Sequence, residues 1–376
     1  MNGKQHSSTH PPTPHPQEDS RFDRLRLLRS YRVGISTYRR LLKEHGTAKS
    51  ALDALPEVAR AAGVAKYQPF SERSLEAELK AGKNAGAVLV DETEPEYPSQ
   101  LAQLDDAPPF LWTIGTTDCL KAPIIALVGA RNASSLGTRM AKRLAAELGE
   151  AGFVIVSGLA RGIDTAAHLA SLETGTVAVQ AGGVDVIYPA ENSQLAKDIA
   201  ERGLRLSEMP IGLQPMARHF PTRNRIISGM AKAVVVVEAA SKSGSLITAK
   251  NALDQGRDVL AIPGHPFDAR AAGCNQMIRD GAILVRSAKD VIEAIEHIAP
   301  PAEPELPMPP AERSLRDTNK LHQDILARLG PSPMAEDQLI RDLKAPAKGV
   351  APILVELEMS GQVIRQPGGL LSKAVS

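Results

Sequence analysis

The residue best suited to binding a charged ligand is Arg131, in the segment Gly129-Ala130-Arg131, where Gly129 is a second candidate contact. This segment follows the apolar run 124–128 and precedes a helix expected to begin near Ser134. The free N–H groups and positive dipole end of a helix N-terminus favour a phosphate, and a guanidinium adds two parallel hydrogen bonds. The segment does not match GxGxxG, so it predicts no dinucleotide site. Alternatively, Gly129 only permits the turn and Arg131 forms a surface ion pair.

Two further glycine-containing loops follow predicted strands, one after the run 153–156 and one after 177–179. Glycine lets a ligand approach the backbone closely because it has no Cβ. We therefore expect both loops to contact the same ligand as Arg131, although plain turns would use the same residue types. The candidate contact residues in these loops are Ser157, Gly158, Arg161, Gly182 and Gly183.

Another loop joins the valine run 234–237 to a predicted helix. Its Ser-Gly-Ser sequence at a helix start favours a nest of backbone N–H groups that binds an oxyanion. The loop differs from GxxxxGK[ST], so it does not indicate ATP hydrolysis. The candidate binding residues here are Lys242, Ser243, Gly244, Ser245 and Lys250.

The densest basic segment of the middle region is FPTRNR, at residues 220–225. Two arginines separated by one residue point in different directions on a helix, so one can face a ligand while the other holds the fold. A phenylalanine in this segment can stack on a base. A solvated charged face is the alternative. The candidates from this segment and from a later helix start are Phe220, Arg223, Asn224, Arg225 and Asn275.

No arrangement of side chains in the sequence indicates catalysis. There is no Ser-His-Asp, Cys-His or paired-carboxylate pattern, and His168, His219 and His265 lack the spacing of metal ligands. His168 is interpreted as a core or capping histidine, and Asp164 as a helix cap. We therefore expect no catalytic residue, no metal and no cofactor.

The loops above need a scaffold that brings them together. Short apolar runs suit strands covered on both faces. Their alternation with amphipathic segments predicts an α/β fold with a Rossmann-like, doubly wound, mostly parallel sheet. Because parallel strands end at a shared edge, the cations should gather there, where an extended phosphate-rich ligand such as a DNA strand fits better than one nucleotide. The predicted strands cover 124–128, 153–156, 177–179, 234–237 and 259–262.

Composition divides the chain into five parts. Residues 1–20 are polar and rich in Pro and His, which is typical of a disordered tail. Leucines at helical spacing predict a small helical domain over 21–85, before the sheet domain at 86–298. Residues 299–316 are Pro-rich and are interpreted as a linker. The pattern over 317–376 predicts three helices and a hairpin, which is the order of a winged helix.

The totals limit the partners and surroundings of the chain. With 44 Lys+Arg against 43 Asp+Glu, the net charge is +1, so only a local basic patch can bind a polyanion. No apolar run is long enough to span a bilayer, and the N-terminus lacks the h-region of a signal peptide. Two distant cysteines fit a reducing compartment. We expect a cytoplasmic protein with no membrane partner.

At these loops the chain closely resembles the DNA-processing protein A (DprA, or Smf) family. The resemblance implies a non-catalytic homodimer that binds single-stranded DNA and recruits RecA onto it in natural transformation, with single-strand-binding protein as a further partner. It assigns DNA contact to Arg131 by position, and other basic contacts to Lys250 and the segment 223–225. The matching segments are GAR (129–131), SGLARGIDTAAH (157–168), GGVDVIYP (182–189), FPTRNRIISG (220–229), SGSLITA (243–249), AIPG (261–264) and GCNQMI (273–278).

Two segments depart from the expected pattern of a DNA reader. The turn 31–35 in the helical, SAM-like domain has one glycine where a helix-hairpin-helix usually shows two, so we expect packing there rather than DNA contact. The presumed recognition helix of the winged-helix domain contains Pro352, Glu356 and Glu358, and carboxylates repel phosphates. We expect this last domain to contact protein or to remain unused.

Two other functions stay open. A nucleotide phosphoribohydrolase of the lysine-decarboxylase-like (LOG) group would share a related fold, but the Thr and Glu of that group's PGGxGTxxE loop are absent after Gly182-Gly183. A winged-helix transcription regulator with a sensor core would need a basic recognition helix, which the acidic third helix of this domain does not provide.

Overall fold

The computed structural model describes residues 20–298, 315–330, 332–366 and 368–374. The chain forms two compact units, Met1–Ile298 and Ala299–Ser376, which are treated separately. The predicted tail 1–20 falls outside the described residues except for Ser20, which caps the first helix. The predicted linker 299–316 also lies outside them, except that helix α13 already begins at its last two residues.

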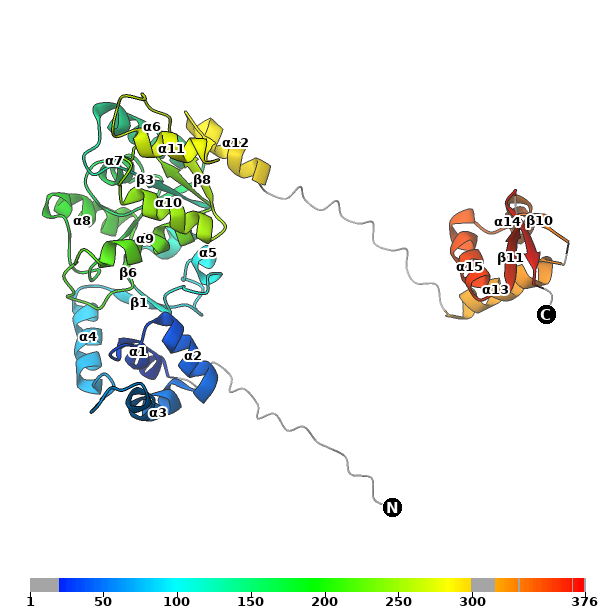
Figure 1. The fold of residues 1–376 in the computed structure, drawn as a ribbon, viewed down its shortest axis with the longest axis horizontal. Helices are drawn as coiled ribbons and strands as arrows, with labels where there is room; N and C mark the ends of the chain where they lie inside the picture. The colour runs from blue at the N-terminus through cyan, green and yellow to red at the C-terminus, as the bar shows by residue number, and fades with distance from the viewer. Residues whose placement is uncertain (1–19, 299–314, 331, 367, 375–376) are drawn as a thin grey trace, which may run out of the picture. The chain divides into compact units, whose positions relative to one another are not determined.

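The first unit begins with four helices, which confirms the predicted helical domain (Figure 1). Hydroxyls of Ser20, Thr47 and Ser71 accept backbone N–H groups at three of the helix starts, as expected of N-cap residues. A buried ion pair between Arg29 and Glu78 ties these helices together, and Glu78 also accepts the indole N–H of Trp112 from the sheet. The helices are α1 (Arg21–Arg29), α2 (Ile35–His45), α3 (Ala48–Ala61) and α4 (Glu72–Asn84).

A nine-stranded sheet follows, in the order β1-β2-β6-β5-β4-β3-β7-β8-β9. The strands from β6 to β9 pair in parallel, whereas β2 pairs antiparallel with both β1 and β6. The predicted mostly parallel sheet is confirmed, although β1, β2, β6 and β9 were not predicted. The strands are β1 (Val88–Asp91), β2 (Phe110–Gly115), β3 (Ile124–Val128), β4 (Val154–Ser157), β5 (Thr176–Val179), β6 (Leu204–Ser207), β7 (Ala233–Val236), β8 (Asp258–Ala261) and β9 (Ile283–Leu284).

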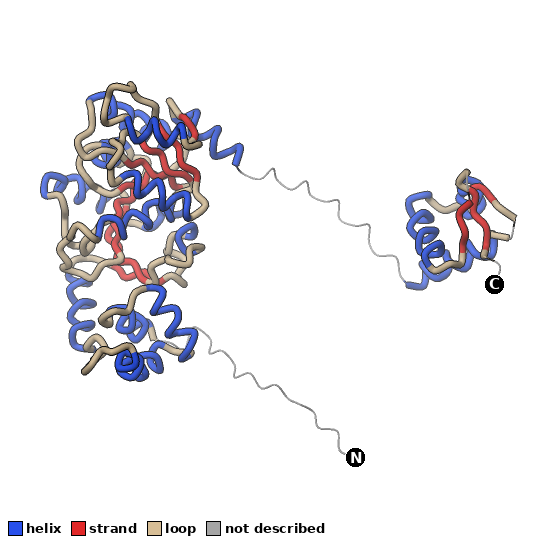
Figure 2. The backbone as a smooth tube through the Cα atoms, viewed as in Figure 1, coloured by secondary structure: helices blue, strands red, loops and turns tan. Residues whose placement is uncertain are grey.

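Helices cover both faces of the parallel strands (Figure 2). Alternate residues of β3 point to opposite faces of the sheet. Ile125 and Leu127 pack with helices α6, α7 and α12 on one face, whereas Ala126 packs with α9, α10 and α11 on the other; the bounds of these helices are given below. This period of two is what a strand buried on both sides requires. The helices are α5 (Ser99–Ala102), α6 (Ser135–Glu150), α7 (Ile163–Ala170), α8 (Ser193–Arg202), α9 (His219–Met230), α10 (Ser245–Asp254), α11 (Ala272–Arg279) and α12 (Ala288–Ile298), with short 3-10 turns at Thr117–Lys121 and Ala190–Asn192.

The chain reverses its direction of travel across the sheet at β3. It moves outward through β4, β5 and β6 on one side, and then returns to β7 on the other side of β3 before continuing to β8 and β9. The loops after β3 and β7 therefore diverge at adjacent strand ends. Such a switch point leaves a crevice outside the carboxyl ends of the strands, where ligands of open α/β sheets bind.

The second unit is a winged helix, as predicted. A buried apolar cluster including Ile325, Leu339, Leu354 and Val363 joins its helices to a three-stranded sheet of order β10-β12-β11. The short strand β10 was not predicted. The elements are α13 (Leu315–Arg328), β10 (Met334–Ala335), α14 (Glu336–Leu343), α15 (Ala347–Met359), β11 (Val363–Gln366) and β12 (Leu370–Lys373). Within the described ranges of both units, every helix is too short or too polar to cross a membrane.

Candidate functional site

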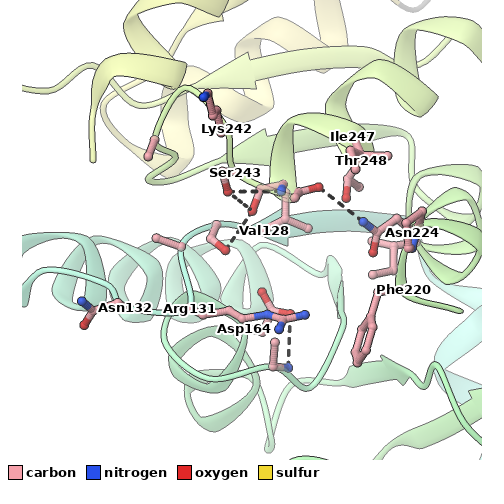
Figure 3. A pocket seen from close by; sticks show the side chains of 18 of the residues that line it. Val128, Arg131, Asn132, Asp164, Phe220, Asn224, Lys242, Ser243, Ile247 and Thr248 are labelled. Carbon is pink, nitrogen blue, oxygen red and sulfur yellow. Dashed lines mark hydrogen bonds between the residues drawn. The ribbon is translucent and has the colours of Figure 1, made fainter. Parts of the chain in front are cut away.

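A cavity of about 550 Å³ opens at the switch point of the sheet (Figure 3). Its walls are the loop after β3, the loop after β7, and the N-terminal parts of α9 and α10. Nine of the seventeen residues predicted to bind DNA line it together, from three separate segments of the chain. They are Gly129, Arg131, Phe220, Arg223, Asn224, Lys242, Ser243, Gly244 and Ser245.

Arg131 lies in the loop after β3 and points into the space beside Phe220 (Figure 3). Its guanidinium carbon is 4.9 Å from the centre of the Phe220 ring, a cation–π contact. Within the described residues Arg131 makes no ion pair or side-chain hydrogen bond, so the alternative of a surface ion pair is wrong. An exposed guanidinium with all its donors unused is available to an anion.

The loops after β3 and β7 are joined directly. The Ser245 hydroxyl donates to the carbonyl of Gly129 at 2.8 Å, and the Asn224 amide donates to the carbonyl of Gly244. The predicted nest at the start of α10 is partly filled, because the Ser243 hydroxyl accepts the N–H of Ser245. That oxygen stands where an oxygen of a bound anion would otherwise sit, so Ser243 must rotate before this N–H can serve a ligand.

Arg223 lines the same cavity from α9, but it is only 4% exposed. One of its terminal nitrogens donates to the carbonyl of Val179, while its Nε has no partner among the described residues. The pKa of Arg223 is lowered to about 10, mainly because the guanidinium is buried. The nearby charge of Asp164 opposes this shift, and the charge of Arg131 adds to it. Two guanidiniums with unused donors therefore face a space that holds no countercharge of its own except Asp164.

Asp164 holds the turn after β4 rather than capping a helix. Its carboxylate accepts the N–H groups of Gly158 and Ala160, whereas the N-cap position of α7 is occupied by Gly162. The prediction that Asp164 caps the helix is wrong, because its side chain turns back toward the loop. Burial raises the pKa of Asp164 in spite of the nearby Arg223.

His168 is a core histidine, which confirms its interpretation. Its Nε2 accepts the N–H of Leu159, and its Nδ1 donates to the Thr176 hydroxyl, which itself donates to the carbonyl of Ile155. These roles require a neutral ring. Burial, and then the charge of Arg223, lower the pKa of His168 to about 3. His168 therefore holds Leu159 in its left-handed conformation, at φ 54°, beside the cavity.

A second cavity of about 370 Å³ lies on the other side of the Arg131–Phe220 contact. It is lined by Gly158, Arg161 and Tyr188, and the Tyr188 ring lies 5.9 Å from that of Phe220. Arg161 is exposed and paired with Glu191, which a ligand phosphate can replace. Sequence reasoning missed Tyr188, although it is one of only five tyrosines in the chain. Ser157, by contrast, is fully buried, and its hydroxyl donates to the carbonyl of Leu127.

Two predicted cations lie away from these cavities. Arg225 is turned toward Glu208, with which it forms a largely buried ion pair, because it is two residues from Arg223 on a helix. Lys250 lies near the middle of α10 and lines a separate groove between α10 and α11. The expectation that both gather with Arg131 is wrong, because a helix that starts at the sheet edge soon carries its residues away from it.

Three other predicted contact residues support the loops instead. The Asn275 amide both accepts the N–H and donates to the carbonyl of Gly264. Gly182 and Gly183 pack against the backbone of segment 210–215 and line neither cavity. Their lack of a side chain permits that packing, so their predicted place on the cavity wall is wrong. Sequence reasoning also missed Asn132, Thr248 and Arg270, which line the first cavity.

Comparison with family models covers all three parts of the chain. Residues 88–296 match the model described as DNA recombination-mediator protein A. Residues 18–81 match a DprA-like N-terminal HHH domain, and residues 309–369 match a DprA winged helix domain.

Individual proteins show the same likeness. Protein Smf of Escherichia coli is 35% identical over 310 residues, which cover 81% of this chain and 82% of that protein. DNA processing protein DprA of Streptococcus pneumoniae is 47% identical over 202 residues, 53% of this chain and 71% of that protein. Its crystal structure superposes with a TM-score of 0.63 at 35% identity, covering 73% of this chain and 98% of that one.

A structure of DNA processing protein A from Helicobacter pylori, which concerns the single-stranded DNA binding mode of that protein, is also similar. It superposes with a TM-score of 0.52 at 28% identity, covering 56% of this chain and 96% of that one. No group of three or more His, Cys, Asp or Glu side chains that could hold a metal ion occurs in the part of the chain that the structure describes.

Proposed function

Since this chain belongs to the DNA recombination-mediator protein A family, we propose that it binds single-stranded DNA along the carboxyl edge of its core sheet and loads RecA onto that DNA. Membership supports a role in DNA processing. The similar Helicobacter pylori protein, whose structure concerns single-stranded DNA binding, supports the choice of ligand.

The observation that carries this proposal is the unpaired guanidinium of Arg131 between two cavities, with aromatic rings beside it. Arg131 binds a backbone phosphate, and the half-buried ring of Phe220 and the exposed ring of Tyr188 accept unstacked bases. Bases of a duplex are already stacked and paired, so they cannot reach these rings without opening the helix. The arrangement therefore favours single strands over duplex.

The test is a salt-titrated binding assay with single-stranded and duplex DNA, using wild type and Arg131→Ala. Loss of a phosphate contact should weaken binding of every sequence about tenfold or more, and reduce the slope of log K against log salt by about 0.7 for a single strand. Arg202→Ala is the matched control, because Arg202 is an exposed, ion-paired arginine at the C-terminal end of α8 and lines no described cavity. Normal binding by Arg131→Ala would refute the assignment of the site.

RecA loading and dimerisation are further parts of the proposal. An edge strand with exposed Ile283 and Leu284 lies beside the groove that contains Lys250, and Leu253 there is 64% exposed. Apolar side chains next to an unpaired strand edge support a protein–protein contact at this surface. Light scattering of Leu253→Glu should then give a monomer, and an unchanged dimer would contradict this surface.

We also propose that the protein is cytoplasmic, that it meets single-strand-binding protein on DNA, and that it has no catalytic activity. RecA filament formation on DNA coated with single-strand-binding protein should proceed faster when the protein is present. Incubation with AMP, followed by chromatography for free adenine, tests the alternative of a nucleotide phosphoribohydrolase. Release of adenine would contradict a purely DNA-binding role.

A further inference from the structure

Phe267 is the most exposed large apolar side chain among the described residues, at 94%. It stands at the tip of the loop 263–271, which follows β8 and is called here the Phe267 loop. The His265 ring lies 5.6 Å from it, tilted by 39°. A phenylalanine held open beside an imidazole offers two π faces to a planar ligand.

The loop is held at its base, so this exposure is a built feature of the fold. The Asn275 amide forms two hydrogen bonds with Gly264, and backbone hydrogen bonds join Asp268 to His265 and Ala271 to Asp268. Arg270 is anchored to Asp268, with Nε 3.1 Å from the carboxylate. Phe267 is 94% exposed, and among the described residues the aromatic ring beside it is that of His265.

The Phe267 loop is continuous with the cavity that contains Arg131. Arg270 lines that cavity, while His265 and Asp268 line a neighbouring cavity of about 540 Å³ against α6. Arg139 lines the same neighbouring cavity and, among the described residues, makes no ion pair or side-chain hydrogen bond. An aromatic pair and an unpaired cation thus lie directly beyond the first cavity.

The strand order sets the direction and length of this path. Strand β4 ends at the Tyr188 cavity, β3 and β7 end at the Arg131 cavity, and β8 ends at the Phe267 loop. Three strand spacings of about 4.8 Å cover about 14 Å. That is several times the rise of 3.4 Å per nucleotide in a stacked strand, so a ligand covering the path contains several nucleotides.

We propose that the Phe267 loop is a second base-stacking platform, where Phe267 and His265 bind bases of the same DNA strand whose phosphate Arg131 holds, and Arg139 contacts its next phosphates. This inference rests on the proposed function and extends it. It assigns to the protein a binding site with aromatic rings at both ends and cations between them, which binds longer strands more tightly than short ones.

The test compares oligothymidylates of about two and about twelve nucleotides, since a path of about 14 Å takes about four stacked nucleotides and the shorter strand cannot reach both of its ends. Phe267→Ala should bind the longer strand about tenfold more weakly, because stacking on one ring is worth that much, and should bind the short strand normally. Phe267→Trp should retain the affinity, whereas Phe267→Leu, which is apolar but has no ring, should not. A 2-aminopurine placed in the longer strand should lose its quenching with Phe267→Ala.

Arg139→Ala should lower the affinity for the longer strand a few-fold, and Lys142→Ala is its matched control, because Lys142 is an exposed cation on the same helix that does not line the cavity. The proposal fails if Phe267→Ala binds the longer strand like wild type while Arg131→Ala does not. Failure of the proposed function looks different, because Arg131→Ala and Phe267→Ala would then both leave binding unchanged.

Discussion

The carboxyl edge of the core sheet and helix α15 of the winged helix are two surfaces that such folds use for ligands, but they differ in chemistry. The core edge carries unpaired Arg131 beside the half-buried ring of Phe220, with the exposed ring of Tyr188 next to it. On α15 the exposed side chains include Val355 at 52% and Met359 at 86%, and a carboxylate oxygen of Glu356 lies 3.3 Å from Nε2 of His322. The two units also differ in the polar side chains that they bury. The core buries the titratable side chains of Asp164, His168 and Arg223, whereas Ser372 is the only buried polar residue among those described in the second unit.

This contrast teaches that a fold type does not carry DNA binding by itself. A winged helix reads DNA when its third helix presents donors and cations to the groove. Over residues 349–359, where its side chains are described, that helix presents apolar and acidic groups, so the shape is retained there without cations. The core edge has no base-reading pattern, yet its unpaired Arg131 offers the donors that a phosphate accepts.

The largest expected difference is between the two units tested separately. Residues 20–298 should bind single-stranded DNA with nearly the affinity of the full chain, because all the cavity-lining residues lie within them. Residues 315–376 should bind single strands and duplex at least about a hundredfold more weakly, as expected without phosphate contacts. Fluorescence anisotropy at several salt concentrations measures both, with circular dichroism to check folding. Tight duplex binding by the smaller fragment would reverse the comparison.

The second prediction concerns acid stability. The pKa of His168 is lowered from 6.5 to about 3, so below pH 6.5 the unfolded chain binds a proton that the folded core does not. The free energy of unfolding should then fall by about 1.4 kcal/mol per pH unit as the pH is lowered. Burial raises the pKa of Asp164, which acts in the opposite sense above pH 3.8, so the effect of His168 is the difference in slope between wild type and His168→Gln over the window from about pH 6.5 to 5.

Urea denaturation of residues 20–298 across that window measures this effect. His168→Gln should remove most of the pH dependence, even if it lowers the stability at pH 7. The winged-helix fragment has no buried titratable side chain among its described residues, so its urea midpoint should change little. The same pH slope in wild type and in His168→Gln would contradict the role of His168.

A third prediction tests how tightly the buried charges are packed beneath the core edge. A Cβ added at Gly158 would lie 2.0 Å from the guanidinium of Arg223, whereas one added at Gly244 would meet nothing within 4 Å. Gly158→Ala should therefore cost about 1–3 kcal/mol of stability through overpacking. Gly244→Ala is the matched control on the same rim, and it should change stability by less than about 0.5 kcal/mol. Equal effects of the two substitutions would show that Arg223 is not fixed.

The smallest expected effect comes from giving α15 the chemistry it lacks. Val355→Lys and Met359→Lys place two cations on its exposed face. Each new phosphate contact should raise the affinity of the winged-helix fragment for duplex DNA only a few-fold at moderate salt. Gel-shift titration measures this, with Val355→Gln and Met359→Gln as the uncharged control. An affinity for duplex DNA that stays unchanged would mean that the surface of α15 lacks the shape for DNA as well as the charge.

The sequence by itself determined the architecture and pointed to Arg131, which lines the cavity at the switch point. Apolar runs of strand length, alternating with amphipathic segments, fixed the parallel sheet because that pattern buries strands on both faces. The three helices and the hairpin of the winged helix were predicted in the same way, from apolar residues at helical spacing and from the glycines and proline of the hairpin turn. Arg131 was identified because its glycine turn follows a buried strand, and strand ends at a switch point form the crevice.

Only the tertiary structure decided which cations share a cavity. Arg223 and Arg225 look equivalent in the sequence, yet one lies buried under the cavity floor and the other pairs with Glu208. Lys250 lies in a separate groove, because the direction of its helix carries the lysine away from the sheet edge. Phe267, which no sequence pattern singled out, lies in a loop after β8 whose base is held by Asn275. Local pattern records which elements form, whereas the rotation of each side chain about its element depends on partners far away in the chain.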